Sequence, residues 1–199
     1  PYGFEIIIVD TGSHDKTKVI AGRYTDKVYD FSWINDFSAA RNFAVSKATY
    51  DIILSLDCDE FIEQFDLEKL QHFLVEQPDA VGRICIKNVT HKNGVRQETK
   101  EWVSRIFFRK KFAYTGRIHE QITEKNGMNY HTYQAPVMVE HVGYDLSGEE
   151  LEKKTKRNIE LLKQELAEAD EEYIPYILYQ LGKSYYMAEA EALLRIINA

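Results

Sequence analysis

The stretch that decides the fold is Asp51-Ile52-Ile53-Leu54-Ser55-Leu56-Asp57-Cys58-Asp59-Glu60. Its first half is an apolar run, which is typical of a strand buried on both faces of a parallel sheet. Its second half is an acidic turn in which one residue separates Asp57 from Asp59. Ligands of open α/β sheets gather beyond the carboxyl ends of the strands, so this turn is a candidate ligand site.

Strands and helices alternate on both sides of this stretch. The apolar run that ends at Asp10 predicts another doubly buried strand, and a third is expected over residues 27–31. Apolar residues at helical spacing predict helices over residues 16–21, 37–48 and 66–77. This alternation predicts an α/β fold with a mostly parallel sheet.

The rest of the chain changes character. Residues 83–89, 102–109 and 136–142 read as strands, with a hairpin at Gly94 between the first two. From Ser147 onward leucine and isoleucine recur every three or four residues, and a second helical stretch covers residues 173–198. We therefore predict an α/β domain over residues 1–146 and an all-α tail over residues 147–199.

The composition excludes several classes of protein. Among 199 residues, 25 Lys and Arg against 32 Asp and Glu give a formal charge of −7, which argues against binding of duplex nucleic acid. The apolar runs are too short for a membrane span. Cys58 and Cys85 make neither a disulfide framework nor a zinc set, and the opening residues predict no signal peptide. We expect a cytoplasmic protein.

The Asp57–Asp59 pair suits a hard divalent cation that bridges a phosphate-bearing ligand. It is not an EF-hand loop, because Phe61 occupies the next ligand position. The alternative is a solvated acidic turn that caps the next helix. Spacing alone does not separate the two interpretations.

A series of motifs decides between them by resemblance. In chain order they are Asp10-Thr11-Gly12-Ser13, Asp36-Phe-Ser-Ala-Ala-Arg41-Asn42, Asp57-Cys58-Asp59-Glu60, Trp102-x-x-Arg105-x-x-x-Arg109, Gly116-Arg-Ile-His119-Glu120 and His141-Val-Gly143-Tyr144. Together they resemble the family 2 glycosyltransferases of GT-A fold, in the branch with a tetratricopeptide-like helical tail. Members of that family usually begin with a further strand and helix, which are absent before Glu5 here. Many of them also carry a second Asp where this chain has Thr11.

The resemblance implies a hexosyltransferase-type enzyme. It would transfer a sugar from a nucleotide-diphosphate donor, a UDP-sugar being favoured, to an unknown protein, glycan or lipid-linked acceptor. The reaction would be inverting and would depend on Mn²⁺ or Mg²⁺. The implied metal ligand is Asp59, with His119 and His141 as further candidates. The implied nucleotide-sugar-binding residues are Asp10, Thr11, Arg41, Asp57, Arg105 and Arg109.

Inverting transfer also needs a general base for the acceptor proton. Glu120 is the leading candidate by resemblance, and Glu101 and Glu60 are its rivals. Two other functions stay open. A nucleotidyltransferase uses similar acidic turns, but the sequence lacks the expected Gly-rich phosphate loop. A non-catalytic helical-repeat interaction protein with a decayed transferase domain is the other alternative.

Overall fold

The computed structural model describes residues 3–92, 95–143 and 148–197, which fall into two units. The first unit holds the described residues up to 143, apart from residues 35–38 and 116–120. Those two short segments belong with the C-terminal helices to the second unit. The Gly94 turn and the domain boundary predicted after residue 146 lie outside the described residues.

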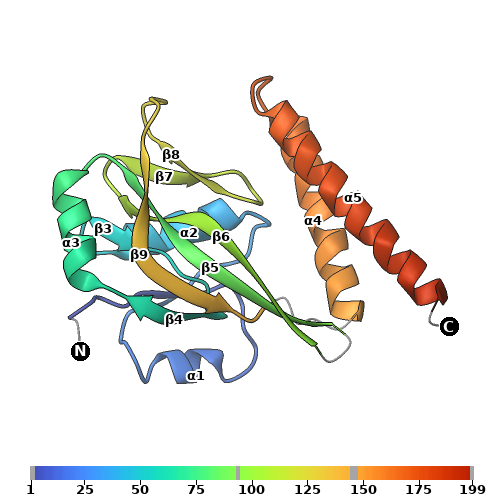
Figure 1. The fold of residues 1–199 in the computed structure, drawn as a ribbon, viewed down its shortest axis with the longest axis horizontal. Coiled ribbons are helices and arrows are strands. Elements are labelled where there is room, and N and C mark those ends of the chain that lie inside the picture. Colours follow the sequence, from blue (N-terminus) through green and yellow to red (C-terminus); the bar gives the residue numbers. More distant parts are fainter. Residues whose placement is uncertain (1–2, 93–94, 144–147, 198–199) are drawn as a thin grey trace. The chain divides into compact units, whose positions relative to one another are not determined.

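A five-stranded sheet forms the centre of the first unit (Figure 1). Its order is β3 (Ile52–Leu54), β6 (Val95–Phe108), β5 (Val81–Lys92), β9 (Thr132–His141) and β4 (Glu60–Phe65). Of these neighbours only β5 and β9 run parallel. The α/β class with a helical tail is confirmed, but the prediction of a mostly parallel sheet was wrong. The sheet is mixed because β5 and β6 follow one another as antiparallel neighbours and β3 joins the outer edge of β6.

The N-terminal part of the first unit has a small sheet of its own. Strands β1 (Ile8–Asp10) and β2 (Val28–Asp30) pair in parallel, and helix α1 (Thr17–Ala21) connects them. The prediction that β1 and β3 are buried on both faces was also wrong. The exposed fraction is 48% for both Ile6, just before β1, and Ile52 on β3. Among the described strands, β3 pairs on one side only, and β1 pairs only with β2.

Apolar side chains pack on both faces of the five-stranded sheet. Ile106 and Phe107 follow one another on β6 and therefore point to opposite faces. Ile106 joins the cluster that packs against helix α3 (Leu67–Glu76). Phe107 joins a second cluster with the hairpin of β7 (Phe112–Thr115) and β8 (Gln121–Glu124). Each face of the sheet is thus covered by its own hydrophobic cluster.

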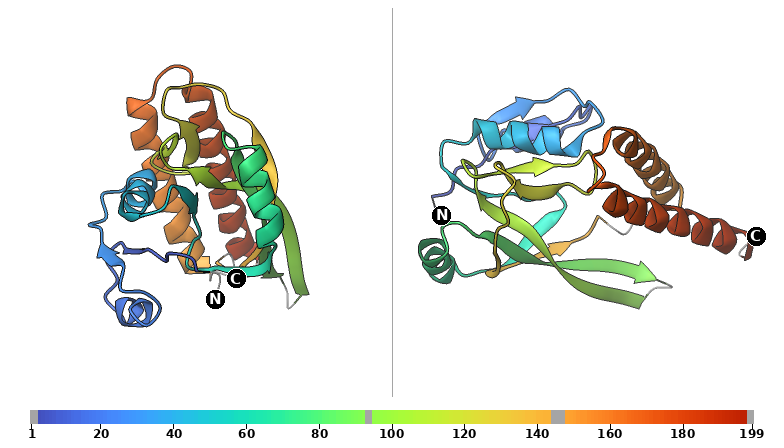
Figure 2. Two further views of the ribbon diagram at one scale, coloured as in Figure 1. Left: turned by 90° about the vertical axis from the view of Figure 1, so that its left-hand side faces the viewer. Right: turned by 90° about the horizontal axis from the view of Figure 1, so that it is seen from above.

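The second unit is built on the helices α4 (Gly148–Glu168) and α5 (Ile174–Ile197), which run side by side as a hairpin (Figures 1 and 2). Leu161, Leu162 and Ile177 form its core together with Ile118. Glu168 also pairs with Arg117 at 2.6 Å. No described helix in the protein is long and apolar enough to cross a lipid bilayer.

Candidate active site

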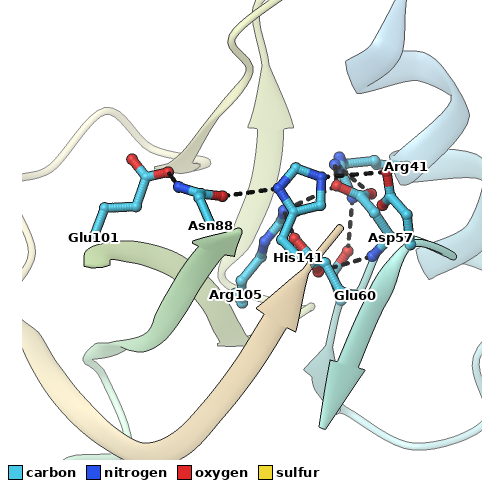
Figure 3. Close-up of polar contacts among 9 residues, drawn as sticks. Arg41, Asp57, Glu60, Asn88, Glu101, Arg105 and His141 are labelled. Carbon is cyan, nitrogen blue, oxygen red and sulfur yellow. Dashed lines mark hydrogen bonds and ion pairs between the residues drawn. The ribbon is translucent and has the colours of Figure 1, made fainter. Parts of the chain in front are cut away.

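The acidic turn after β3 lies against a bulge in β6. Along the β5–β6 ladder Arg83 pairs with Ser104 and Gly82 with Ile106, so Arg105 is an extra residue between two pairs. A bulge re-aims the side chain that it carries. Here the Arg105 guanidinium donates to Asp57 at 3.0 Å and to Glu60 at 2.8 Å (Figure 3).

Helix α2 (Phe37–Lys47) supplies a second guanidinium to the same turn. Arg41 donates to Asp57 at 2.8 Å and to the Ser55 hydroxyl at 3.2 Å. The next residue, Asn42, fixes the helix to β7, because its amide both donates to and accepts from the backbone of Tyr114. The structure therefore brings together Arg41, Asp57 and Arg105, three of the residues predicted to bind the nucleotide sugar.

The buried side chain of Glu60 stabilises the acidic turn. Its carboxylate accepts the backbone N–H of Asp57 at 2.9 Å, and only 2% of its side chain is exposed. Burial raises the pKa of the Glu60 carboxyl against the opposing charge of Arg105. Burial also acts to raise the pKa of Asp57, but Arg41 and Arg105 outweigh it and hold that pKa below its usual range. Asp57 is thus kept as a carboxylate that is partly exposed to ligands.

Asp59 faces His141, the last residue of β9. The Nε2 atom of His141 lies 3.2 Å from Oδ2 of Asp59. Two ligands at right angles, each about 2.1 Å from an octahedral cation, would lie about 3 Å apart. A Cβ atom on Gly143 would lie 2.0 Å from the same Oδ2 and 2.8 Å from the same Nε2, so glycine keeps this space open. The pair therefore fits one edge of a divalent-cation site.

The described residues hold no cluster of three or more His, Cys, Asp and Glu side chains that could bind a metal. The single carboxylate of Asp59 nevertheless suits Mg²⁺-like cations, which commonly take one or two carboxylates together with substrate phosphates and water. His119, the other predicted metal ligand, belongs to the second unit, as does the predicted base Glu120. Tyr176 in that unit donates its hydroxyl to the carbonyl of His119 at 3.1 Å.

The remaining predicted residues have other partners. Asp10 is buried, and its carboxylate accepts the backbone N–H groups of Gly12 and Ser13, so it shapes its own turn while Thr11 is exposed. Hydrogen bonds from Ser13 lower the pKa of Asp10. Arg109 pairs with Asp51 at 3.3 Å, at the opposite end of β3 from the acidic turn.

One residue of the site was missed by the sequence analysis. Asn88 bridges His141 and Glu101, and it is buried. The signal for it was its position two residues after the buried Ile86, at the end of the core face of β5.

A comparison with protein families shows which family has a sequence like that of this chain. The family model described as Glycosyl transferase family 2 matches residues 1–133. The chain belongs to that family. The Asp57–Asp59 turn, Arg41 and Arg105 of this family 2 member all lie within the matched region, whereas His141 follows it.

Individual proteins are similar to this family 2 chain over different spans. The SPbeta prophage-derived glycosyltransferase SunS of Bacillus subtilis is 25% identical over 190 residues, which are 94% of this chain and 44% of SunS. A TPR repeat-containing protein of Synechococcus elongatus is 40% identical over 91 residues, 46% of this chain and 22% of that protein. The chain thus spans less than half the length of the curated relatives it matches.

Solved structures of TarS from S. aureus are also similar to this chain. TarS residues 1–349 give a TM-score of 0.46 at 16% identity, covering 92% of this chain and 63% of that one. The same fragment in complex with UDP gives 0.47 at 17% identity, covering 89% and 61%.

Proposed function

We propose that the protein transfers a sugar from a nucleoside-diphosphate donor to an acceptor, with inversion and with the help of Mn²⁺ or Mg²⁺. The observation that carries the proposal is the Asp59–His141 pair beside Asp57, which two arginines hold, in a chain of glycosyltransferase family 2. Carboxylate and imidazole ligands beside guanidinium groups suit a diphosphate that arrives with a divalent cation. The nucleotidyltransferase alternative has no comparable support.

The chain's own residues divide the work. Arg41 and Arg105 orient the Asp57 carboxylate. Its remaining lone pairs accept hydrogen bonds from hydroxyl groups of the donor. Asp59 and His141 would hold the metal, which would neutralise the charge that grows on the departing diphosphate. Asp10 and Thr11 stay proposed contacts of the nucleotide.

The proposed general base is Glu120, on the resemblance of its His-Glu pair. It takes the proton of the acceptor hydroxyl as that oxygen forms its bond to the anomeric carbon. At the same time the bond from this carbon to the diphosphate oxygen breaks, and the nucleoside diphosphate leaves with the electron pair. The acceptor and the cytoplasmic location stay predictions.

A thermal-shift titration with UDP, with and without Mn²⁺, tests the proposal. A ligand at 100 times its Kd adds about 2.7 kcal/mol, which raises the Tm of a protein of this size by about 5–11 °C. We expect this rise only when Mn²⁺ is present, and its loss in Asp59→Asn. Asp51→Asn is the matched control, because it makes the same change at the opposite end of β3 and should keep the rise.

Gly143→Ala tests the cation site without replacing either of the proposed metal ligands. The new Cβ would collide with the end of the Asp59 side chain, which can move, so the variant should fold. Its carboxylate should no longer face His141, and the Mn²⁺-dependent rise should disappear as in Asp59→Asn. A rise that survives in both variants, or that needs no Mn²⁺, contradicts the metal site. Silence of the wild type with UDP, GDP and CDP contradicts the nucleotide-sugar function and favours the interaction protein.

A further inference from the structure

The turn that carries the proposed base is held by the helical hairpin. Residues 116–120 connect β7 with β8 and belong to the same unit as α4 and α5. Two of them have a left-handed backbone, Gly116 with a φ of 93° and His119 with a φ of 53°. Glycine adopts this conformation readily, but a residue with a side chain keeps it only where the surroundings hold it. The contacts of the 116–120 turn therefore matter for the direction of Glu120.

The last turn of α4 holds the first half of the 116–120 turn. The carboxylate of Glu165 accepts the backbone N–H of Arg117 at 3.1 Å, and Glu168 pairs with the Arg117 guanidinium at 2.6 Å. A Cβ atom on Gly116 would lie 3.1 Å from the same oxygen of Glu165, so glycine allows this close approach. The side chain of Ile118 is buried in the core of the helical hairpin. The first half of the turn is thus fixed through its backbone and through two side chains.

The first turn of α5 holds the second half. Tyr176 donates its hydroxyl to the carbonyl of His119 at 3.1 Å. This carbonyl belongs to the peptide group that joins His119 to Glu120, and a peptide group is planar. A hydrogen bond that fixes the carbonyl therefore also fixes the N–Cα bond of Glu120, from which its side chain starts.

We propose that Glu165 and Tyr176 are positioning residues that hold the 116–120 turn in its left-handed conformation and thereby aim the Glu120 carboxylate at the acceptor hydroxyl. The helical tail then contributes to the transfer step as well as to the stability of its own unit. The role of Glu120 as the base rests on the proposed function, whereas the conformation of the turn does not. The two parts are therefore tested by separate measurements.

Tyr176→Phe is the decisive change, because it removes one hydroxyl and keeps the ring that lies against Tyr173. A general base contributes about 10²–10⁴-fold to a rate, and a misplacement of about 1 Å can cost about 100-fold. We expect the release of UDP from UDP-glucose or UDP-N-acetylglucosamine in water to fall about 10–100-fold. The Mn²⁺-dependent rise of the Tm with UDP should stay at the wild-type value, because UDP lacks the acceptor oxygen on which the base acts.

Two further variants separate positioning from a general loss of structure. Tyr179→Phe is the matched control, because it makes the same change about one turn further along α5, where the side chain is exposed. It should leave both readouts unchanged. In a Glu120→Gln background, Tyr176→Phe should lower UDP release no further, because a residue that acts only through Glu120 has nothing left to position. An equal loss in both backgrounds would overturn the inference.

The conformation of the turn is measured without any substrate. Backbone couplings and chemical shifts of His119 in nuclear magnetic resonance spectra report the sign of its φ. We expect a positive φ in the wild type and in Tyr179→Phe, and an average over several conformations in Tyr176→Phe. In Glu165→Met, which removes the acceptor of the Arg117 N–H, the amide hydrogen of Arg117 should exchange faster than in the wild type.

The two measurements distinguish the possible failures. A negative φ of His119 in the wild type, or an unchanged one in Tyr176→Phe, overturns the inference even if UDP release falls. If the turn changes as expected while Glu120→Gln releases UDP at the wild-type rate, the positioning contacts stand and the proposed base fails. If the wild type turns over neither UDP-sugar, the backbone measurement alone decides whether Glu165 and Tyr176 hold the turn.

Discussion

Two arginine–aspartate pairs lie at opposite ends of the β3–β6 pairing. Arg105 holds Asp57 at the carboxyl end of β3, and Arg109 holds Asp51 at its amino end, at 3.0 and 3.3 Å. The exposed fraction of the side chain is 9% for Arg105 and 26% for Arg109. Arg105 shares a second, buried carboxylate, that of Glu60. An arginine–aspartate pair is thus part of a buried network at the carboxyl end of β3 and a surface contact at its amino end.

This difference in burial distinguishes the ion pair of the candidate site from an ordinary ion pair on the surface. An exposed ion pair is screened by water and salt and contributes about 0–1 kcal/mol. In a buried network each charge depends on its partner, because a buried charge without a partner is costly. The end with Arg105 is also the end where β3 runs into the Asp57–Asp59 turn. Burial, and not the residue types, therefore distinguishes the two ends.

The largest expected effect is that of Arg105→Met. It leaves the Glu60 carboxylate buried without its cation, so the free energy of unfolding should fall by about 3–5 kcal/mol. Urea denaturation at neutral pH measures the loss. The double variant Arg105→Met with Glu60→Gln should recover part of it, since a buried amide needs no counter-charge. A loss below about 1 kcal/mol in the single variant would make this end no different from the other.

The sequence predicted both arginines to bind the nucleotide, and the structure shows why it did not separate them. Four residues along a strand amount to about 13 Å, so two arginines at this spacing need not share a ligand. The bulge that aims Arg105 at Asp57 is set by the register of β5 against β6, and register is not written in the local pattern of β6. The acidic turn itself was predictable, because a short apolar strand followed by Asp57 and Asp59 is a local signal.

The sheet directions and three strands were not predictable for a related reason. The hydrophobic pattern marks which residues are extended, but the choice between parallel and antiparallel neighbours depends on residues far apart in sequence. No strand was predicted at β4, since Phe61 and Ile62 are exposed and the strand lacks an alternating pattern. Strands β7 and β8 have only four residues each. Asn88 was missed because its role comes from its neighbours on two other strands.

A smaller effect is expected for Arg109→Met, which makes the same change as Arg105→Met at the exposed end. The variant removes one of the two cations beside Asp51, and Lys110 remains at 2.7 Å. The free energy of unfolding should change by at most about 1 kcal/mol, and the Mn²⁺-dependent response to UDP should stay at the wild-type value. Loss of that response would place Arg109 in the site after all, as the sequence predicted.

The smallest effect is the pH-dependent part of the Asp51 contribution. The hydrogen bond from Lys110, with the charge of Arg109, holds the pKa of Asp51 below its usual range. A carboxyl whose pKa is lower in the folded than in the unfolded protein adds stability that is fully present above the unfolded value, near pH 4, and is lost as the pH falls through the folded value. The stability of the wild type relative to Asp51→Asn should therefore be greatest near pH 7 and should shrink below pH 4 in urea denaturation. High salt at pH 7 should reduce the same difference, because Asp51 and its partners are partly exposed. A difference that stays constant from pH 7 to pH 3 would mean that Asp51 acts through packing and not through its charge, and the contrast between the two ends of β3 would then rest on Arg105 alone.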